Sequence, residues 1–255
     1  MAGARRATVV TYALLLALAA LAWVDVLRSA TAMDDMAGME MAMAPSLSEG
    51  VVFVVAWTVM MAAMMLPSAS PMIALYAATH RNAPSPVVRA VAVTHFTLVY
   101  VALWAATGIP IYLVTVVLGA LGRLALAYGI AVALIVAGGF QFSPLKRVCL
   151  RHCRSPLGFL LGRWRPGWRG ALSMGWAHAV YCLGCCWALM LVLVVAGAMG
   201  LVWVLLIAAV VTAEKLLPGG ERVAWVSGVV LVLLGLAVAL RPEIAMMLRA
   251  GPRSM

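Results

Sequence analysis

The sequence predicts an all-α protein, a polytopic transmembrane helical bundle of about six to seven spans. Of its 255 residues, 66% are hydrophobic and only 10% are charged, and the mean hydropathy is +1.09. Apolar runs of about 18 residues or more with few charges are typical of membrane-spanning helices. The runs are continuous rather than alternating, which excludes the strand pattern of a membrane barrel. Helices are therefore expected throughout, because each satisfies its own backbone hydrogen bonds in lipid.

The expected helices follow one another with short connections. The first covers residues 8–27, and its apolar core is longer than that of a signal peptide, which favours a membrane anchor. The second covers residues 50–66 and is expected to kink or break at Pro67 and Pro71, before residues 72–79. The remaining helices are expected over residues 90–112, 124–140, 171–195, 201–215 and 223–240.

The chain shows no internal repeat and no second domain. We expect an anchor helix with an external Met-rich loop over residues 1–49, and a helical membrane domain over residues 50–240. Within that domain, residues 143–169 form a strongly basic loop that contains cysteines, and residues 241–255 form a short tail.

The net charge of +10 raises the question of nucleic-acid binding. The chain has no nucleic-acid motif, and cytoplasmic loops explain the charge better. If the N-terminus is inside, 13 of the 18 Lys and Arg residues lie in inner segments and 5 in outer segments. This bias places the 143–169 loop in the cytoplasm and the Met-rich loop outside. The tail, with three outer arginines, is the exception, and it would move inside if the last helix failed to span.

Thiols and an imidazole occur together on the helix expected over residues 171–195, as His178, Cys182, Cys185 and Cys186. Spacings of four and three residues place them near one helix face. Thiolate and imidazole are the ligands that Cu(I) and Zn(II) prefer, so a metal site is predicted. Two alternatives remain: small cysteines that pack tightly in a helix interface, and a C-x-x-C redox dithiol, although no thioredoxin-like pattern surrounds it.

The basic loop carries a second pair of thiols, Cys149 and Cys153, with His152 beside them. On one helical turn the two thiols would meet, and neighbouring cations lower the pKa of a thiol. Two thiolates would offer Cu(I) a linear site on the cytoplasmic side. The alternative is a basic loop that only obeys the positive-inside rule. The odd total of five cysteines does not fit a secreted disulfide framework.

Methionines form two groups with soft thioether ligands for Cu(I). The first lies in the expected external loop among three carboxylates and comprises Met33, Met36, Met39, Met41 and Met43. The second lies on the helix over residues 50–66 and includes Met60, Met64 and Met65. The external group favours copper capture. For the second group, adaptable core packing is an equal alternative to a thioether path into the membrane.

Three further polar residues lie within or at the ends of expected spans. His95 would either join His178 or bond a backbone carbonyl as a structural histidine. Lys215 lies near a helix end, where its side chain could reach the interface. Glu214 is the stronger candidate for a functional or proton-linked role, because intramembrane carboxylates are costly.

Three motifs carry a resemblance to a known family. They are Trp57-x-x-Met60-x-x-Ala63-Met64-Met65-Leu66-Pro67-Ser68 with Pro71, Gln141-x-x-Pro144-Leu145-Lys146-x-x-Cys149-Leu150-x-x-Cys153-Arg154, and Tyr181-Cys182-Leu183-Gly184-Cys185-Cys186-Trp187 with Met190. With the Glu214-Lys215 pair, these resemble the bacterial predicted metal-binding integral membrane proteins, a domain of unknown function, over residues 50–240. The resemblance implies a multi-pass bacterial inner-membrane protein linked to metals, copper above all.

Together these observations predict a non-enzymatic membrane protein that handles copper by capture, transfer or delivery as Cu(I), with zinc as the second candidate metal. No nucleotide motif is present. The expected partners are the lipid bilayer, the metal ion and a periplasmic copper protein or membrane cuproenzyme. A membrane thiol-disulfide protein and a non-catalytic assembly subunit of a membrane complex are the alternatives.

Overall fold

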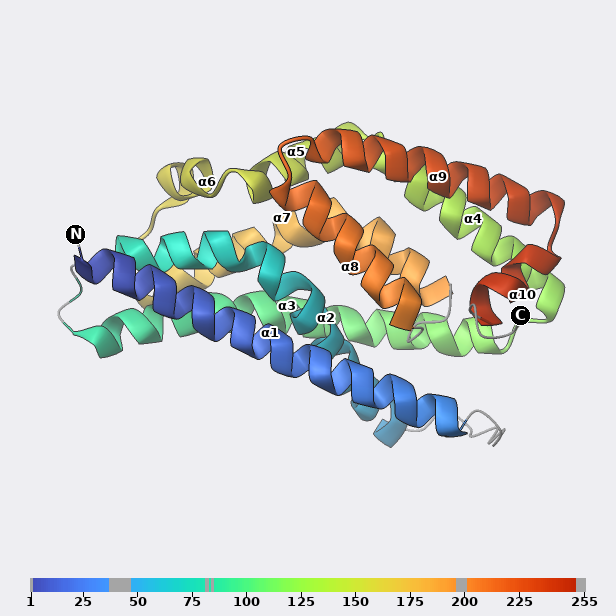
Figure 1. The fold of residues 1–255 in the computed structure, drawn as a ribbon, viewed down its shortest axis with the longest axis horizontal. Helices are drawn as coiled ribbons and strands as arrows, with labels where there is room; N and C mark the ends of the chain where they lie inside the picture. The colour runs from blue at the N-terminus through green and yellow to red at the C-terminus, as the bar shows by residue number, and fades with distance from the viewer. Residues whose placement is uncertain (1, 37–46, 81–82, 84, 196–200, 251–255) are drawn as a thin grey trace.

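The computed structural model describes residues 2–36, 47–80, 83, 85–195 and 201–250, and these residues form ten helices (Figure 1). In chain order they are α1 Ala2–Met36, α2 Leu47–Thr79, α3 Pro86–Gly119, α4 Arg123–Gln141, α5 Pro144–Arg154, α6 Pro156–Arg163, α7 Gly167–Val195, α8 Leu201–Leu216, α9 Gly220–Leu240 and α10 Glu243–Ala250.

Six of the described helices are long and apolar enough to cross a membrane, which confirms the predicted helical membrane fold. These candidate spans are Val9–Arg28, Leu47–Thr79, Pro86–Gly119, Arg123–Gln141, Gly167–Val195 and Gly220–Leu240. The 16-residue α8 is shorter than these, yet it packs among them, against α2, α7 and α9. The two chain ends lie at opposite ends of the long axis (Figure 1).

Helix α2 continues through both of its prolines and bends partway along its length (Figure 1). Pro71 has no N–H with which to bond the Pro67 carbonyl four residues earlier. The Ser70 hydroxyl donates to that carbonyl instead, at 2.8 Å. The helix therefore bends at its prolines without the break that the sequence left open.

Several expected boundaries are wrong. Helix α1 extends to Met36, so the backbone of Met33 and Met36 is helical rather than part of a loop, while Met39, Met41 and Met43 lie outside the described residues. Helix α3 is longer than residues 90–112, because it begins at Pro86, directly after the Ser85 N-cap, and continues to Gly119.

The expected basic loop over residues 143–169 contains two short helices, α5 and α6. Ser143 caps α5 by accepting a hydrogen bond from the Lys146 N–H at 3.1 Å, and Pro144 occupies the first turn, where its missing N–H costs nothing. This capped helix is what carries the second pair of thiols. The tail likewise begins with a short helix, α10.

Small residues let the helices approach closely. A Cβ atom built on Gly138 of α4 would lie 2.7 Å from the Gly228 carbonyl oxygen of α9, so only glycine fits at this crossing. In lipid, such close backbone contact is a main source of helix–helix attraction. The α4–α9 pair forms one side of the bundle. Helix α7 is central in the bundle and packs against α3, α4, α5 and α8.

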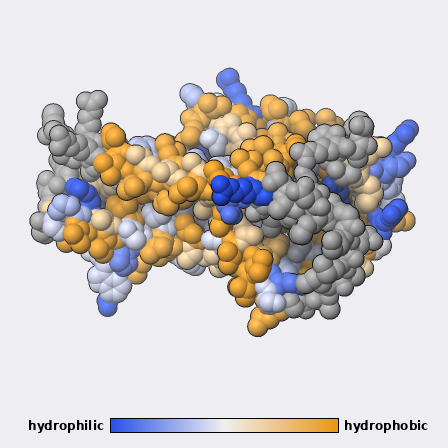
Figure 2. Space-filling view, turned by 60° about the horizontal axis from the view of Figure 1, so that its bottom comes forward, coloured by the Kyte–Doolittle hydropathy of each residue, from blue (hydrophilic) through white to orange (hydrophobic). Residues whose placement is uncertain are grey.

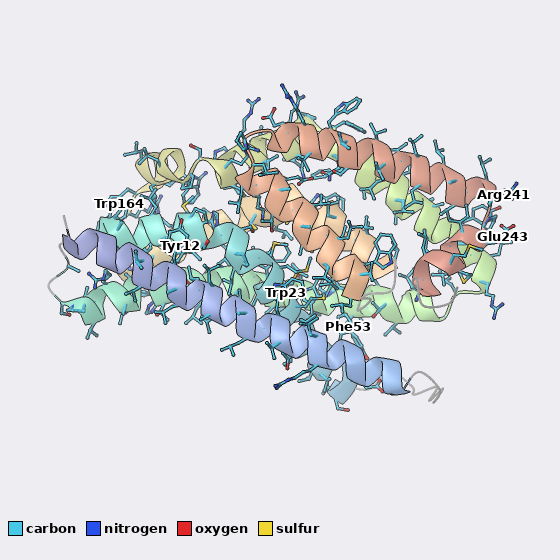
Figure 3. The ribbon with its side chains drawn as sticks, viewed as in Figure 1. Tyr12, Trp23, Phe53, Trp164, Arg241 and Glu243 are labelled. Carbon is cyan, nitrogen blue, oxygen red and sulfur yellow. The ribbon has the colours of Figure 1, made fainter. Side chains whose placement is uncertain are left out.

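The outer surface suits a bilayer. Hydrophobic side chains cover much of the face seen in Figure 2, and exposed residues on the spans include Leu98 and Leu233. Trp164 lies at the end of the molecule that holds α6 and the N-terminus, and Arg241 and Glu243 lie at the opposite end (Figure 3).

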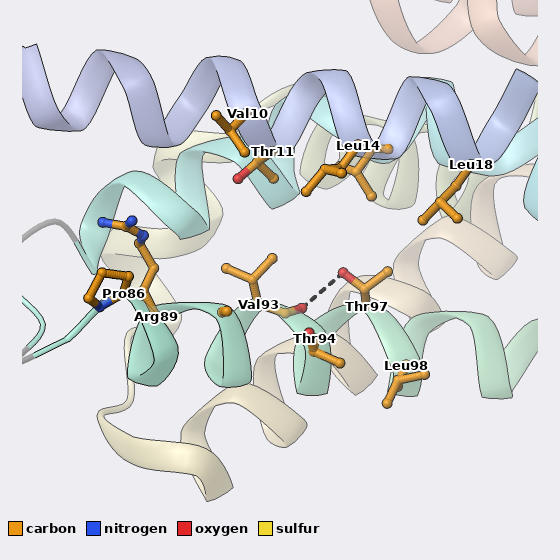
Figure 4. A pocket seen from close by; sticks show the side chains of 12 residues that line it. Val10, Thr11, Leu14, Leu18, Pro86, Arg89, Val93, Thr94, Thr97 and Leu98 are labelled. Atoms are coloured by element: carbon orange, nitrogen blue, oxygen red, sulfur yellow. Dashed lines mark hydrogen bonds between the residues drawn. The ribbon is translucent and has the colours of Figure 1, made fainter.

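An apolar groove of about 590 Å³ separates α1 from α3 (Figure 4). Leu14 and Leu18 line one wall, and Val93 and Leu98 line the other. No thiol lines this groove. The candidate chemistry lies elsewhere, inside the bundle around α7.

Candidate metal centre

Helix α7 carries three buried thiols in its middle. Cys182, Cys185 and Cys186 are each 1% exposed. The Cys185 and Cys186 thiols donate to the Cys182 carbonyl oxygen, at 3.1 and 2.9 Å. These bonds hold both sulfurs on the side of the helix toward Cys182, so the three side chains form one group within the bundle.

The short helix α5 adds its own thiols to this group. Cys153 Sγ lies 3.8 Å from Cys185 Sγ across the α5–α7 contact. A Cβ atom at Gly184 would lie only 2.7 Å from Cys149 Sγ, so the missing side chain there makes room for α5. The expectation of separate sites in the loop and in the membrane is therefore wrong: both sets of cysteines meet in one cluster.

The α5 thiols are not activated by the basic residues around them, contrary to expectation. Burial raises the pKa of the Cys149 thiol and outweighs the lowering effect of Lys146. Hydrogen bonds with Cys182 and Cys185 raise the pKa of the Cys153 thiol well above its usual range. Both thiols thus keep their protons at neutral pH in the metal-free protein.

Two arginines and the imidazole of α5 have other partners. Arg151 Nε pairs with Glu221 Oε1 at 3.2 Å, and Arg154 donates to the backbone carbonyls of Glu214 and Pro218. His152 stacks on Tyr181 with ring centroids 4.1 Å apart and does not join the cluster. These contacts explain why the basic sequence around the two thiols does not activate them.

The ammonium group of Lys215 is buried against Cys182. Lys215 Nζ donates to Cys182 Sγ at 3.0 Å and to Ser68 Oγ at 3.2 Å, and it lies 3.6 Å from Met65 Sδ. On another side, the Tyr100 hydroxyl lies 3.1 Å from Cys182 Sγ. The expectation that Lys215 reaches the interface is wrong: the residue is 6% exposed, because its acceptors lie inside the bundle.

Three methionines of α2 are buried in the core, and one of them approaches this cluster. Met60, Met64 and Met65 are 2%, 1% and 0% exposed and belong to the core. The sulfur of Met65 approaches the cysteine cluster through Lys215. Helix α2 therefore presents a thioether close to the thiols of α7.

Next to Lys215, Glu214 has a different set of partners. Lys146 Nζ lies 2.6 Å from Glu214 Oε2, and both side chains are 1% exposed. Gln141 Nε2 donates to Glu214 Oε1 at 3.0 Å, and the Ser227 hydroxyl donates to the same oxygen at 3.3 Å. Sequence reasoning missed these partners, although Gln141 and Lys146 belong to the second motif. The network joins α4, α5, α8 and α9 and fixes α5 on the bundle.

His178 is the least satisfied polar group near the thiols. It is 2% exposed, and neither ring nitrogen has a hydrogen-bond partner among the described residues. Its ring stacks on Tyr100, with centroids 5.4 Å apart, one helical turn from Cys182. A buried unpaired imidazole is costly unless a water or an ion satisfies it, which makes His178 a candidate ligand.

His95 does not join this group. Its Nδ1 lies 2.7 Å from the Val91 carbonyl oxygen, one turn earlier on α3. Of the two roles expected for His95, the structure therefore supports the structural one.

No set of three or more His, Cys, Asp or Glu side chains in the described part of the chain is arranged to hold a metal ion. Structural Zn(II) sites normally use four tetrahedral ligands. The two sulfurs of Cys153 and Cys185, which are in contact, are a low-coordinate arrangement of the kind that soft metal ions accept.

Comparison with known proteins agrees with this chemistry. A family model described as "PpoB2: Copper chaperone" matches residues 54–238. The matched region contains all three motifs and the Glu214-Lys215 pair, and it confirms the resemblance drawn from the sequence. No curated protein and no solved structure matches the chain.

Proposed function

Because the chain belongs to the PpoB2 copper chaperone family, we propose that it binds Cu(I) within the membrane and delivers it to another protein. The cargo is held by the thiols at the contact of α5 and α7. Copper is the substrate of this delivery, and no chemical conversion takes place. The protein acts as a carrier rather than as an enzyme.

One observation carries the proposal: Cys153 Sγ and Cys185 Sγ lie 3.8 Å apart although they come from different helices. Two thiols in contact can share one ion after small side-chain rotations, and each releases its proton to solvent as the metal binds. Cu(I) accepts such low-coordinate thiolate sites. Cys182 and Cys186 supply further sulfur, and His178 supplies an imidazole with no other partner among the described residues.

The route to this cluster begins at the methionines. The external Met33–Met43 segment captures copper through thioethers, which need no deprotonation. Met60, Met64 and Met65 of α2 then offer thioethers along a buried helix that reaches Lys215. The recipient is a periplasmic copper protein or a membrane cuproenzyme, in a bacterial inner membrane.

The same sulfur pair supports a second candidate, a membrane thiol-disulfide protein. Closing Cys153 and Cys185 into a disulfide requires the sulfurs to approach from 3.8 Å to about 2.0 Å. This pairing differs from the C-x-x-C pairing expected from the sequence. Thiol trapping in intact cells distinguishes the two functions, because only a redox protein cycles between free and disulfide forms.

The test of copper delivery is a Cu(I) titration of the full-length protein, purified without metal, against a chromophoric Cu(I) chelator. Cys153→Ser and Cys185→Ser should each lose most of the tightly bound copper. Cys149→Ser is the matched control, because its sulfur lies against Gly184 rather than in the close sulfur pair. It should lose less. Unchanged copper binding in Cys153→Ser and Cys185→Ser would refute the proposal.

A further inference from the structure

Lys215 is a buried cation for which the described residues show no carboxylate partner. The neighbouring Glu214 is already paired with Lys146. A buried ammonium is costly unless its charge is compensated and its protons are hydrogen-bonded. The surroundings of Lys215 therefore require an explanation beyond ordinary ion pairing.

The acceptors of Lys215 are the kinds of group that hold Cu(I). Its Nζ donates to Cys182 Sγ and lies 3.6 Å from Met65 Sδ, with Ser68 Oγ as a third acceptor. One sulfur comes from α7 and the other from α2. A singly charged cation thus lies between a thiol and a thioether, at the point where the methionine helix meets the cysteine helix.

We propose that Lys215 is a displaceable internal cation: in the metal-free protein its ammonium lies where Cu(I) binds between Cys182 Sγ and Met65 Sδ, on the way to the Cys153–Cys185 pair, and it withdraws when Cu(I) enters. This inference rests on the proposed copper function and adds a residue that sets the affinity for the cargo. Lys215 withdraws with its proton, Cu(I) takes its place, and a proton on Cys182 Sγ is released to solvent when the sulfur binds the metal.

The position of Lys215 permits this movement. It is the residue before the last in α8, and the next residues, Leu216 and Leu217, are 48% and 50% exposed. A lysine near a helix end can extend its four-carbon stem and place its charged group at the interface. The side chain can therefore withdraw without losing its proton and without a shift of the helix.

The test compares Lys215→Leu with the wild-type protein in the Cu(I) titration. Leucine removes the competing cation and adds no ligand. We expect Cu(I) affinity to rise about tenfold, because Cys182 no longer has to give up a charge-assisted hydrogen bond.

A matched pair of serine variants provides a milder test that spares the buried lysine. Ser68→Ala removes one acceptor of Lys215, and we expect about threefold tighter Cu(I) binding. Ser70→Ala is the control, because this hydroxyl bonds the Pro67 carbonyl on the same helix. Its Cu(I) affinity should equal that of the wild type.

Equal or weaker Cu(I) binding by a folded Lys215→Leu would overturn the inference. If that variant does not fold, equal Cu(I) affinities of Ser68→Ala and Ser70→Ala would overturn it instead. These failures leave the proposed function intact, because the wild type still binds copper through its thiols. Failure of the proposed function is a different result, in which the wild type itself does not bind Cu(I).

Discussion

Glu214 and Lys215 are consecutive residues of α8, both charged and both buried, yet their surroundings differ in kind. Glu214 faces Lys146, Gln141 and Ser227, so its charge is matched and both carboxylate oxygens accept hydrogen bonds. Lys215 faces Cys182, Ser68 and Met65, and no carboxylate compensates it in the described residues.

The polar network around Glu214 is structural, whereas the groups around Lys215 include the candidate metal ligands. A fully satisfied buried network holds helices in one arrangement, whereas a partly satisfied one is costly unless it serves a function. The side of Lys215 also contains His178, whose ring nitrogens have no partner among the described residues. The imidazole without a partner thus lies with the soft ligands, whereas the satisfied carboxylate of Glu214 lies where α5 attaches, although Gln141 Oε1 there has no partner among the described residues.

The largest effect on stability is expected when the Glu214 network is disrupted. Lys146→Met leaves the Glu214 carboxylate buried without its cation, which should cost about 3–5 kcal/mol of unfolding free energy. Denaturant unfolding in detergent micelles measures this. The double variant Lys146→Met/Glu214→Leu should recover much of the loss, because it removes both charges.

The exposed ion pair of α5 provides the control for that experiment. Arg151 and Glu221 are 69% and 49% exposed, so Arg151→Met should have little effect on stability. If Lys146→Met were as harmless as Arg151→Met, the Glu214 network would not be what attaches α5 to the bundle.

A smaller effect is expected where α5 meets α7. Gly184→Ala places a methyl group against Cys149 Sγ and should cost about 1 kcal/mol, because the thiol can rotate only partly away. The spacing of Cys153 and Cys185 should change as well, and oxidative cross-linking of these two thiols should slow down. Gly139→Ala is the control, since nothing lies within 4 Å of a Cβ there. Cross-linking at the wild-type rate in Gly184→Ala would show that the glycine does not set this contact.

The least perturbing experiment tests which end of the bundle faces the cytoplasm. Val148 of α5 and Glu243 of α10 are both exposed, and they lie on segments predicted to face opposite sides. A membrane-impermeant maleimide applied to intact cells should label Glu243→Cys and spare Val148→Cys. The wild type is the background control. The reverse labelling pattern would invert the predicted orientation.

The helices were predictable because hydropathy alone identifies membrane-spanning segments, and residues 124–140 nearly coincide with α4. Boundaries were missed where local chemistry overrides a simple rule. The Ser85-Pro86 pair starts α3 before residue 90, and the Ser143-Pro144 pair starts α5 inside an expected loop. Both pairs are helix-start signals that the sequence shows.

The candidate site was predictable only within one helix. Spacing places His178, Cys182 and Cys185 near one face of α7. The approach of Cys153 to Cys185 and the inward direction of Lys215 result from tertiary packing, which residue spacing does not encode. The sequence predicts which residues have suitable chemistry, and the fold determines which of them meet.

The most direct test of the central claim is X-ray absorption spectroscopy of the full-length protein loaded with Cu(I). If the cluster at the α5–α7 contact holds the cargo, the copper should have sulfur in its first coordination shell. In Cys153→Ser/Cys185→Ser that sulfur signal should fall sharply, with Cys149→Ser retaining most of it. A shell of only nitrogen and oxygen, or a sulfur shell unchanged in the double variant, would contradict the account.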